Sequence, residues 1–263
     1  MQTLFEKLAG ARVFDLAQPY FVGMPHHPSH PPFLFGLVKQ HGDFVGPIGN
    51  SSASEAIALG GHVGTHIDAL CHFSCCGKLY GGVPAAEVQS YRDGVGRYSV
   101  DTVSGILRRG VLLDIAGQAG IPELPEDFEI TPAHLDEAVR AQKVAIRAGD
   151  VVLLRTGWAN YFQDARKYVS EVRGPGPAKP GAEWLSSRGV FAAGSDTLAF
   201  EKVPDAGMPV HVHLLAEQGI HIIECLNLEE LAAARVYEFL FVAAPLKIRG
   251  ATGSPIRPMA VVV

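Results

Sequence analysis

The sequence has little charge and no long apolar run, and both shortages exclude classes of function. Charged residues make up 19% of the 263 positions, and the formal net charge is −5. No run of Lys or Arg is long enough to neutralise a row of phosphates, so we expect no nucleic-acid partner. The longest apolar stretches, such as 151–154 and 239–244, are far shorter than the roughly 20 residues that cross a bilayer. We therefore expect no membrane partner either.

Cysteine is also scarce, which argues against a disulfide framework. Cys71, Cys75 and Cys76 lie close together and Cys225 stands alone, so we predict reduced thiols. A zinc cluster on the first three is a weaker alternative, because its fourth ligand would compete with a stronger site nearby. The first residues lack the basic start and apolar run of a secretion signal, and we expect a cytoplasmic location.

Neither an internal repeat nor a low-complexity tract interrupts the chain. With 48% apolar residues, a chain of this length can bury one sizeable core, and we expect a single domain over residues 1–263. Short apolar runs bounded by Gly or Asp alternate with helical patterns, which predicts a mixed α/β (α+β) fold. The expected strands are 55–59, 110–114, 150–155, 189–193, 221–224 and 237–244, and the expected helices begin at Thr131 and cover 180–188 and 228–234.

Residues 15–33 are rich in proline, so they cannot continue a helix or a central strand. We predict a long ordered surface loop, a kind of segment that is often functional. Its His26, His27 and His30 could form a second metal site, but without matched spacing we interpret them as a polar loop, and contact with substrate stays an open alternative. The individual roles of His26 and His27 stay open.

Three of the eleven histidines fall between His62 and Phe73, a density that calls for an explanation. His62, His66 and Asp68 supply nitrogen and oxygen donors that suit Zn, Mn or Fe and leave coordination positions for water and substrate. The alternative is that these are three surface or core histidines that bind no metal.

Spacing restricts how these donors meet. On an ideal strand His62 and His66 share a face but lie about 13 Å apart, too far for one ion. On a helix they would meet, yet Asp68 would point away. Only a bent segment brings all three together, and Gly64 permits such a bend.

This segment resembles the His-x-Gly-Thr-His-x-Asp-x-Pro-x-His signature of the cyclase-like metal hydrolases, the family of bacterial kynurenine formamidase, isatin hydrolase and cyclic imide hydrolases. The resemblance covers nearly the whole chain and includes a second block near the end. The other matching segments are 15–25, 153–158, 194–197, 208–211 and 219–231. Two departures are Leu70 at the usual Pro position and Cys225 in place of a common Asn, and the first leaves the substrate class open.

The resemblance implies a swivelling β/β/α domain with His62, His66 and Asp68 as metal ligands and His72 as the catalytic histidine. His211 and Glu224 match residues that, in some members, complete a second metal position or contact the substrate, and we place them with His72 in the catalytic set.

Several other residues have both a structural and a functional interpretation. Glu224 ends an apolar strand, where a carboxylate is costly to bury unless it is paired or metal-bound. If the segment of His211 and His213 is extended, both lie on one face, and His213 has a packing role or none. A serine nucleophile at Ser195 is rejected, because no Gly-x-Ser-x-Gly elbow exists. The aromatic residues expected to wall a substrate pocket are Phe21, Phe33 and Trp158.

The hypothesis is therefore a hydrolase in which Zn²⁺ or Mn²⁺ activates water for attack on an amide-type carbonyl of a small-molecule substrate. His72 relays the proton to the leaving nitrogen. The substrate is a cyclic amide, an imide or an aryl formamide. Alternatives are a lactone hydrolase, a metal-dependent lyase or isomerase, and a non-enzymatic metal or small-molecule binding protein.

Assembly is a further expectation. The loop 15–33 carries Tyr20, Phe21, Val22, Met24 and Phe33, and so many apolar side chains must pack on something. Members of the resembled family are commonly oligomers, so we expect a homodimer or homotetramer with this loop at or near the interface.

Overall fold

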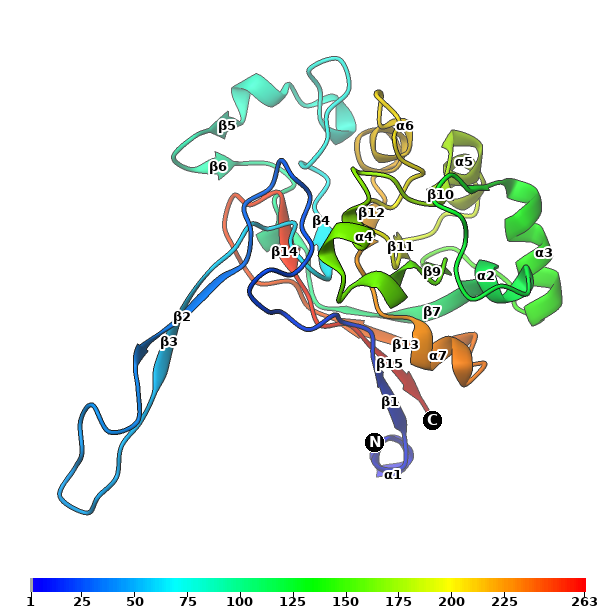
Figure 1. Cartoon of the computed structure of the whole chain (residues 1–263). Coiled ribbons are helices and arrows are strands. Elements are labelled where there is room, and N and C mark those ends of the chain that lie inside the picture. Colours follow the sequence, from blue (N-terminus) through cyan, green and yellow to red (C-terminus); the bar gives the residue numbers. More distant parts are fainter. Residues whose placement is uncertain (1) are drawn as a thin grey trace.

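The computed structural model describes residues 2–263 and centres on one nine-stranded mixed sheet (Figure 1). Parallel pairing joins the four central strands, and antiparallel pairing adds the strands on either side. The order across the sheet is β1 (Arg12–Asp15), β15 (Met259–Val262), β13 (Glu238–Ala243), β7 (Ile106–Asp114), β9 (Val151–Arg155), β11 (Ala192–Ser195), β12 (His221–Glu224), β4 (His66–Asp68) and β14 (Gly253–Pro255).

Both faces of the sheet are covered, because its central strands carry buried apolar side chains on both sides. Val151 and Leu153 of β9 face one cluster, which α7 (Glu229–Ala233) and the loops after β4 cover. Val152 and Leu154 face the other, where most of the helices lie (Figure 1). Those helices are α2 (Ile115–Gln118), α3 (Pro132–Gln142), α5 (Lys179–Ser186), α6 (Pro209–His211) and η5, a π-helix (Val212–Gln218). The predicted mixed α/β fold is confirmed.

The remaining elements are short. They are α1 (Gln2–Ala9), η1 (Tyr80–Gly82), η2 (Ala85–Glu87), η3 (Val100–Thr102), η4 (Trp158–Tyr161), α4 (Ala165–Val169), the pair β5 (Gln89–Ser90) and β6 (Gly94–Val95), and the pair β8 (Glu129–Ile130) and β10 (Gly176–Pro177). No helix within residues 2–263 has the length and apolar character that a membrane crossing requires.

Most predicted elements are present, and two need correction. The helix from Thr131 begins as expected, with the Thr131 side chain accepting from the His134 backbone N–H. The strand expected at 189–193 lies at Ala192–Ser195, because Gly189 turns the chain out of α5 with φ +66°. The extended segment considered for His211 and His213 is wrong, since these residues lie in α6 and η5.

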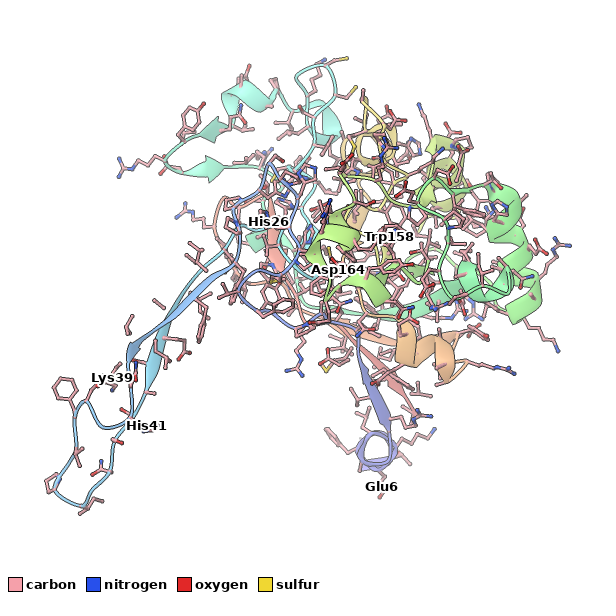
Figure 2. The ribbon with its side chains drawn as sticks, in the orientation of Figure 1. Glu6, His26, Lys39, His41, Trp158 and Asp164 are labelled. Atoms are coloured by element: carbon pink, nitrogen blue, oxygen red, sulfur yellow. The ribbon has the colours of Figure 1, made fainter. Side chains whose placement is uncertain are left out.

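A two-stranded arm leaves the body of the molecule. It consists of β2 (Leu34–Lys39) and β3 (Ser54–Ala58), which pair only with each other, and Figure 2 labels Lys39 and His41 far from the body. Its apolar side chains are exposed, including Phe44 (77%) and Ile48 (90%).

The loop 15–33, by contrast, packs on its own chain. Met24 and Phe33 are buried against Val63 and Phe162 in a third apolar cluster. The apolar side chains of this loop therefore pack largely on the same chain, and the exposed apolar surface belongs mainly to the arm.

The bend predicted at Gly64 is present and positions β4. Gly64 has φ +63°, and the chain enters the strand only at His66. The Tyr20 hydroxyl donates to the Val63 carbonyl (2.6 Å) and fixes the bend from outside. A Cβ on Gly64 would lie 2.7 Å from the Tyr20 ring and 2.9 Å from Met24.

Replacing Gly64 by Ala should therefore destabilise the fold by about 2 to 5 kcal/mol, since left-handed backbone and overpacking both oppose a methyl group. Urea unfolding of Gly64→Ala and the parent chain measures this difference. Gly105→Ala is the matched control, because Gly105 is exposed and its Cβ would meet nothing within 4 Å. Equal stabilities for all three proteins would show that the bend does not require glycine.

Candidate active site

The predicted ligands converge on the buried carboxylate of Asp68, which is 0% exposed. His62 Nδ1 lies 2.7 Å from Asp68 Oδ1, and His66 Nε2 lies 3.5 Å from the same oxygen. The ring of His72 stacks on that of His62 with 3.9 Å between centroids. The structure thus brings together His62, His66, Asp68 and His72, which the sequence singled out.

Strand pairing adds Glu224 to this group. In the antiparallel β12·β4 ladder Glu224 is directly opposite His66, so the two side chains share one face. Glu224 Oε2 lies 3.3 Å from His66 Nε2, and Oε1 lies 3.2 Å from His211 Nε2. His211 reaches the site from α6, so all six predicted metal and catalytic residues meet in one place.

For two of the imidazoles, those of His66 and His211, a hydrogen bond on the far side of the ring fixes which nitrogen faces the carboxylates. His66 Nδ1 donates to the Gly64 carbonyl at 2.8 Å, which leaves Nε2 toward Asp68 and Glu224. Such an outer hydrogen bond orients a metal-binding imidazole and selects its tautomer.

Glu201 does the same for His211, and sequence reasoning missed it. Its Oε1 lies 2.6 Å from His211 Nδ1 and accepts the His211 backbone N–H at 2.9 Å. Glu201 is only 1% exposed. The available signal was a carboxylate directly after the apolar run 198–200, which is costly to bury without a partner. No sequence spacing, however, connects it with α6.

The donor set fits a divalent metal ion. Two groups of donor atoms, each within 4.8 Å of one another, share Asp68: one with His62 and His72, the other with His66 and Glu224. His66 Nε2 and Asp68 Oδ2 are buried without a hydrogen-bond partner among the described residues. Nitrogen and carboxylate donors suit Zn²⁺ or Mn²⁺, and unsatisfied buried polar atoms are expected where an ion completes the site.

The carboxylates and imidazoles perturb one another strongly. Burial alone would raise the pKa of Asp68, but the surrounding imidazoles, with His62 hydrogen-bonded to its carboxylate, hold that pKa well below its usual range. Burial opposes ionisation of Glu224 as well, yet its ion-pair contacts with His211 and His66 lower its pKa to about 2. Both carboxyl groups are therefore ionised at neutral pH.

The pKa values of His72 and His211 are shifted in opposite directions. Burial lowers the pKa of His72 to about 3, so its imidazole is neutral. Burial also acts to lower the pKa of His211, but hydrogen bonds with Glu201 and Glu224 raise it to about 10, so this imidazole is protonated. Groups with separated pKa values are suited to opposite acid and base roles.

The loop histidines divide between the site and its surroundings. The ring of His30 lies 5.1 Å from that of His62 and 6.3 Å from that of His72, with His27 5.1 Å behind it. The loop 15–33 thus closes over the cluster. His213 instead lies between Ser186 and Glu217, in line with the packing role considered for it.

The predicted substrate-binding aromatics lie apart from the histidines. Phe21 and Phe33 line an apolar cavity of about 720 Å³ between the loop and the base of the arm. Trp158, labelled in Figure 2, is buried and donates from Nε1 to the Tyr168 carbonyl (3.0 Å). None of the six metal and catalytic residues lines that cavity.

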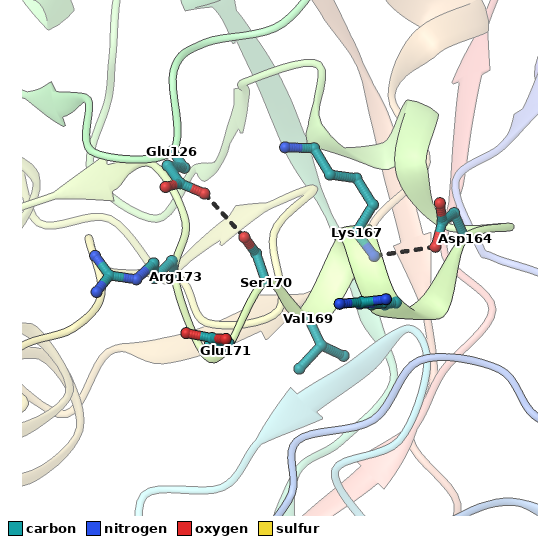
Figure 3. Close-up of a pocket in the computed structure, with 8 residues that line it drawn as sticks. Glu126, Asp164, Lys167, Val169, Ser170, Glu171 and Arg173 are labelled. Atoms are coloured by element: carbon teal, nitrogen blue, oxygen red, sulfur yellow. Dashed lines mark hydrogen bonds between the residues drawn. The ribbon is translucent and has the colours of Figure 1, made fainter.

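Another cavity, of about 660 Å³, lies at α4 and is mostly charged (Figure 3). Glu126 and Ser170 hydrogen-bond across it at 2.9 Å. Its lining likewise contains none of the six site residues. The zinc cluster considered at Cys71, Cys75 and Cys76 is not formed, because the Cys71 thiol is directed at the Ala251 carbonyl.

Comparison with known proteins agrees with this geometry. The Cyclase family, described as "Putative cyclase", matches residues 14–202. The chain belongs to this family. Isatin hydrolase of Roseibium aggregatum is 30% identical over 216 residues, 78% of this chain and 73% of that protein. Kynurenine formamidase of Bacillus cereus is 28% identical, over 92% and 94% of the two chains.

Solved structures of the family share the fold. A crystal structure of a novel cyclase superposes with a TM-score of 0.90 at 30% identity, covering 100% of this chain and 90% of the other. Isatin hydrolase A from Ralstonia solanacearum gives 0.79 at 28% identity, covering 100% and 97%. The family resemblance recognised from the histidine motif is confirmed.

Because both donor groups include Asp68, replacing it by Ala should remove bound metal altogether rather than reduce it in part. Elemental analysis of purified Asp68→Ala and parent protein after loading with Zn²⁺ tests this. Glu217→Gln is the matched control, since among residues 2–263 the Glu217 carboxylate pairs with the outlying His213 and with none of the six site residues. Near-stoichiometric metal in Asp68→Ala would mean that the ligand assignment is wrong.

Proposed function

We propose that this chain is a metal-dependent hydrolase that opens the amide-type C–N bond of a small cyclic amide, imide or aryl formamide. The observation that carries the proposal is the convergence of His62, His66, His72 and Glu224 on Asp68. A protein that only stored metal would have no use for His211, whose Nε2 is aimed into the site while Glu201 holds its Nδ1. The named relatives act on isatin, a cyclic amide, and on a formamide.

The ion, Zn²⁺ or Mn²⁺ in this proposal, would be held by His62, His66 and Asp68, with His72 and Glu224 available to complete the two donor groups. When bound, a divalent ion supplies Lewis-acid polarisation of the scissile carbonyl and makes water more acidic. His72 and Glu224 therefore have two candidate roles, as ligands or as groups that act on substrate.

The chain's own residues supply the proton transfers. A neutral His72 accepts a proton from the attacking water, which is the general-base role of imidazole. A protonated His211 donates to the leaving nitrogen, and Glu201 keeps its ring oriented. The rings of His72 and His211 lie 6.3 Å apart, a separation that lets both reach one small substrate. The loop histidine His30 helps to exclude water above His62.

A hydrolysis screen tests the reaction class. Zn²⁺- and Mn²⁺-loaded protein should hydrolyse at least one of isatin, a cyclic imide or N-formylkynurenine, and the metal-free protein should not. Lactones form the comparison arm. Turnover of a lactone with no activity on any C–N substrate would overturn the proposed bond specificity, and inactivity of loaded protein on all of them would remove the hydrolase assignment.

His72→Ala separates catalysis from metal binding. If His72 acts as the base, turnover should fall by about 10² to 10⁴ while metal content stays nearly intact. Turnover and metal content are measured on the same sample, with His213→Ala as a control that should change neither. Loss of metal from His72→Ala would make this residue a ligand and contradict its role as the base.

We also propose that the chain forms a homodimer or homotetramer and that the arm lies in the interface. An isolated two-stranded hairpin is marginally stable alone, and the tip of this one exposes Phe44, Val45 and Ile48. Large exposed apolar patches mark interaction surfaces. The loop 15–33 joins the arm at its base, which keeps it near the interface. The unpaired thiols fit a reducing compartment, and a cytoplasmic location is part of the proposal.

Light scattering tests the assembly. The intact chain should be oligomeric, and the double variant Phe44→Ser with Ile48→Ser should shift toward monomer because it loses apolar contacts in the interface. Tyr91→Ser is a matched control, since Tyr91 is fully exposed on a different hairpin. A monomeric, fully active parent chain would contradict the assembly, and so would an unchanged oligomer in the double variant.

A further inference from the structure

Two adjacent thiols lie at an exposed turn outside the proposed active site. Cys75 and Cys76 place their sulfurs 3.8 Å apart. Cys76 is exposed and Cys75 half-buried. The other two cysteines, Cys71 and Cys225, are buried. The Cys71 thiol faces the Ala251 carbonyl, and burial raises the pKa of this thiol to about 12.

The backbone holds this pair in a fixed turn. Cys75 and Lys78 exchange both backbone hydrogen bonds at 2.9 Å, and the two residues between them have positive φ, +51° at Cys76 and +74° at Gly77. This is the type I′ hairpin geometry. The base is tied down as well, since Ala85 N–H donates to the Gly77 carbonyl and Leu79 is buried. The two sulfurs are therefore preorganised.

A direct disulfide does not suit this arrangement. Adjacent Cα atoms are about 3.8 Å apart across a trans peptide, which is shorter than the roughly 4.4 to 6.8 Å found in most disulfides. A bridging atom that binds both sulfurs avoids this strain. Zinc would need two further protein ligands, and no group of three potential ligands among residues 2–263 includes a cysteine. The geometry favours a soft centre that needs only two sulfurs.

We propose that Cys75 and Cys76 form a chelating site for a monosubstituted trivalent arsenical. The reactant is an arsenic(III) centre that carries one carbon substituent and two hydroxyl groups. Two As–O bonds break and two As–S bonds form, each thiol proton leaves with one hydroxyl group, and two water molecules are released. Arsenic remains trivalent, so no oxidant or reductant is required.

The site is connected with the proposed active site through its base. The turn follows His72 by three residues in the chain, and Tyr80 of η1 packs on Gly219, at the end of the π-helix η5 that continues from His211. The chelate itself is independent of the proposed hydrolase function and requires no bound metal.

Phenylarsine oxide, which hydrates to the required arsenic(III) species, is the probe. Mass spectrometry of the intact native chain should show one arsenic adduct, with the loss of two titratable thiols. Cys75→Ser and Cys76→Ser should each weaken binding by about 100-fold, because the second sulfur then no longer acts intramolecularly. Cys71→Ala is the matched control and should bind as the parent does.

Release gives a second measurement that does not depend on variants. A dithiol should remove the arsenical, and a monothiol at the same thiol concentration should not. Equal affinity in the single-serine variants, or equal release by the monothiol, would overturn the proposal. Recovery of a Cys75–Cys76 disulfide as the resting form of the purified chain would also overturn it.

Discussion

The site depends on one buried negative charge. Asp68 is fully buried in β4, the strand next to the edge strand β14, and Glu224 and Glu201 bury two further carboxylates around it. A buried charge costs several kcal/mol unless it is paired. The chain offsets this cost by placing imidazoles beside the carboxylates. Burial alone would lower the pKa of His66, but the Asp68 and Glu224 carboxylates beside it raise that pKa well above its usual range. So much demand for positive charge is what a divalent cation satisfies.

Two features of the backbone place Asp68 beside its partners. The bend at Gly64 turns the chain so that His62 returns to face Asp68, and antiparallel pairing of β12 with β4 places Glu224 opposite His66. Because β4 lies between β12 and β14, its side chains cannot shift without disrupting three strands. Rigid placement of this kind is what a catalytic site needs from its scaffold.

The sequence was sufficient for the local part of this arrangement and insufficient for the distant part. The spacing of His62, His66 and Asp68 excluded a straight strand and a helix, which left the bend that Gly64 makes. Glu201 could not be found in this way, because its contact with His211 arises from the packing of α6 and not from periodicity. One strand of the arm was predicted, at 55–59, but its partner β2 was missed, as was the exposure of both, since these strands carry apolar side chains that this chain does not bury.

Burial gives Trp158 a structural role in this fold. Trp158 is large and apolar, and such a residue is more often part of a core than of a substrate pocket. Its indole N–H is satisfied within the chain by Tyr168. The histidines of the loop 15–33 are closer to the site. The ring of His30 lies beside that of His62, and Phe33 of the same loop is buried.

The central claim is that Asp68 anchors a divalent ion, and locating the ion in a crystal tests it most directly. Anomalous scattering from crystals of Zn²⁺-loaded protein should give a peak within coordination distance of Asp68 and of at least one of His62 and His66, about 2.0 to 2.2 Å for nitrogen and oxygen ligands. A peak elsewhere, or none at Asp68 in crystals that contain stoichiometric zinc, would contradict the account.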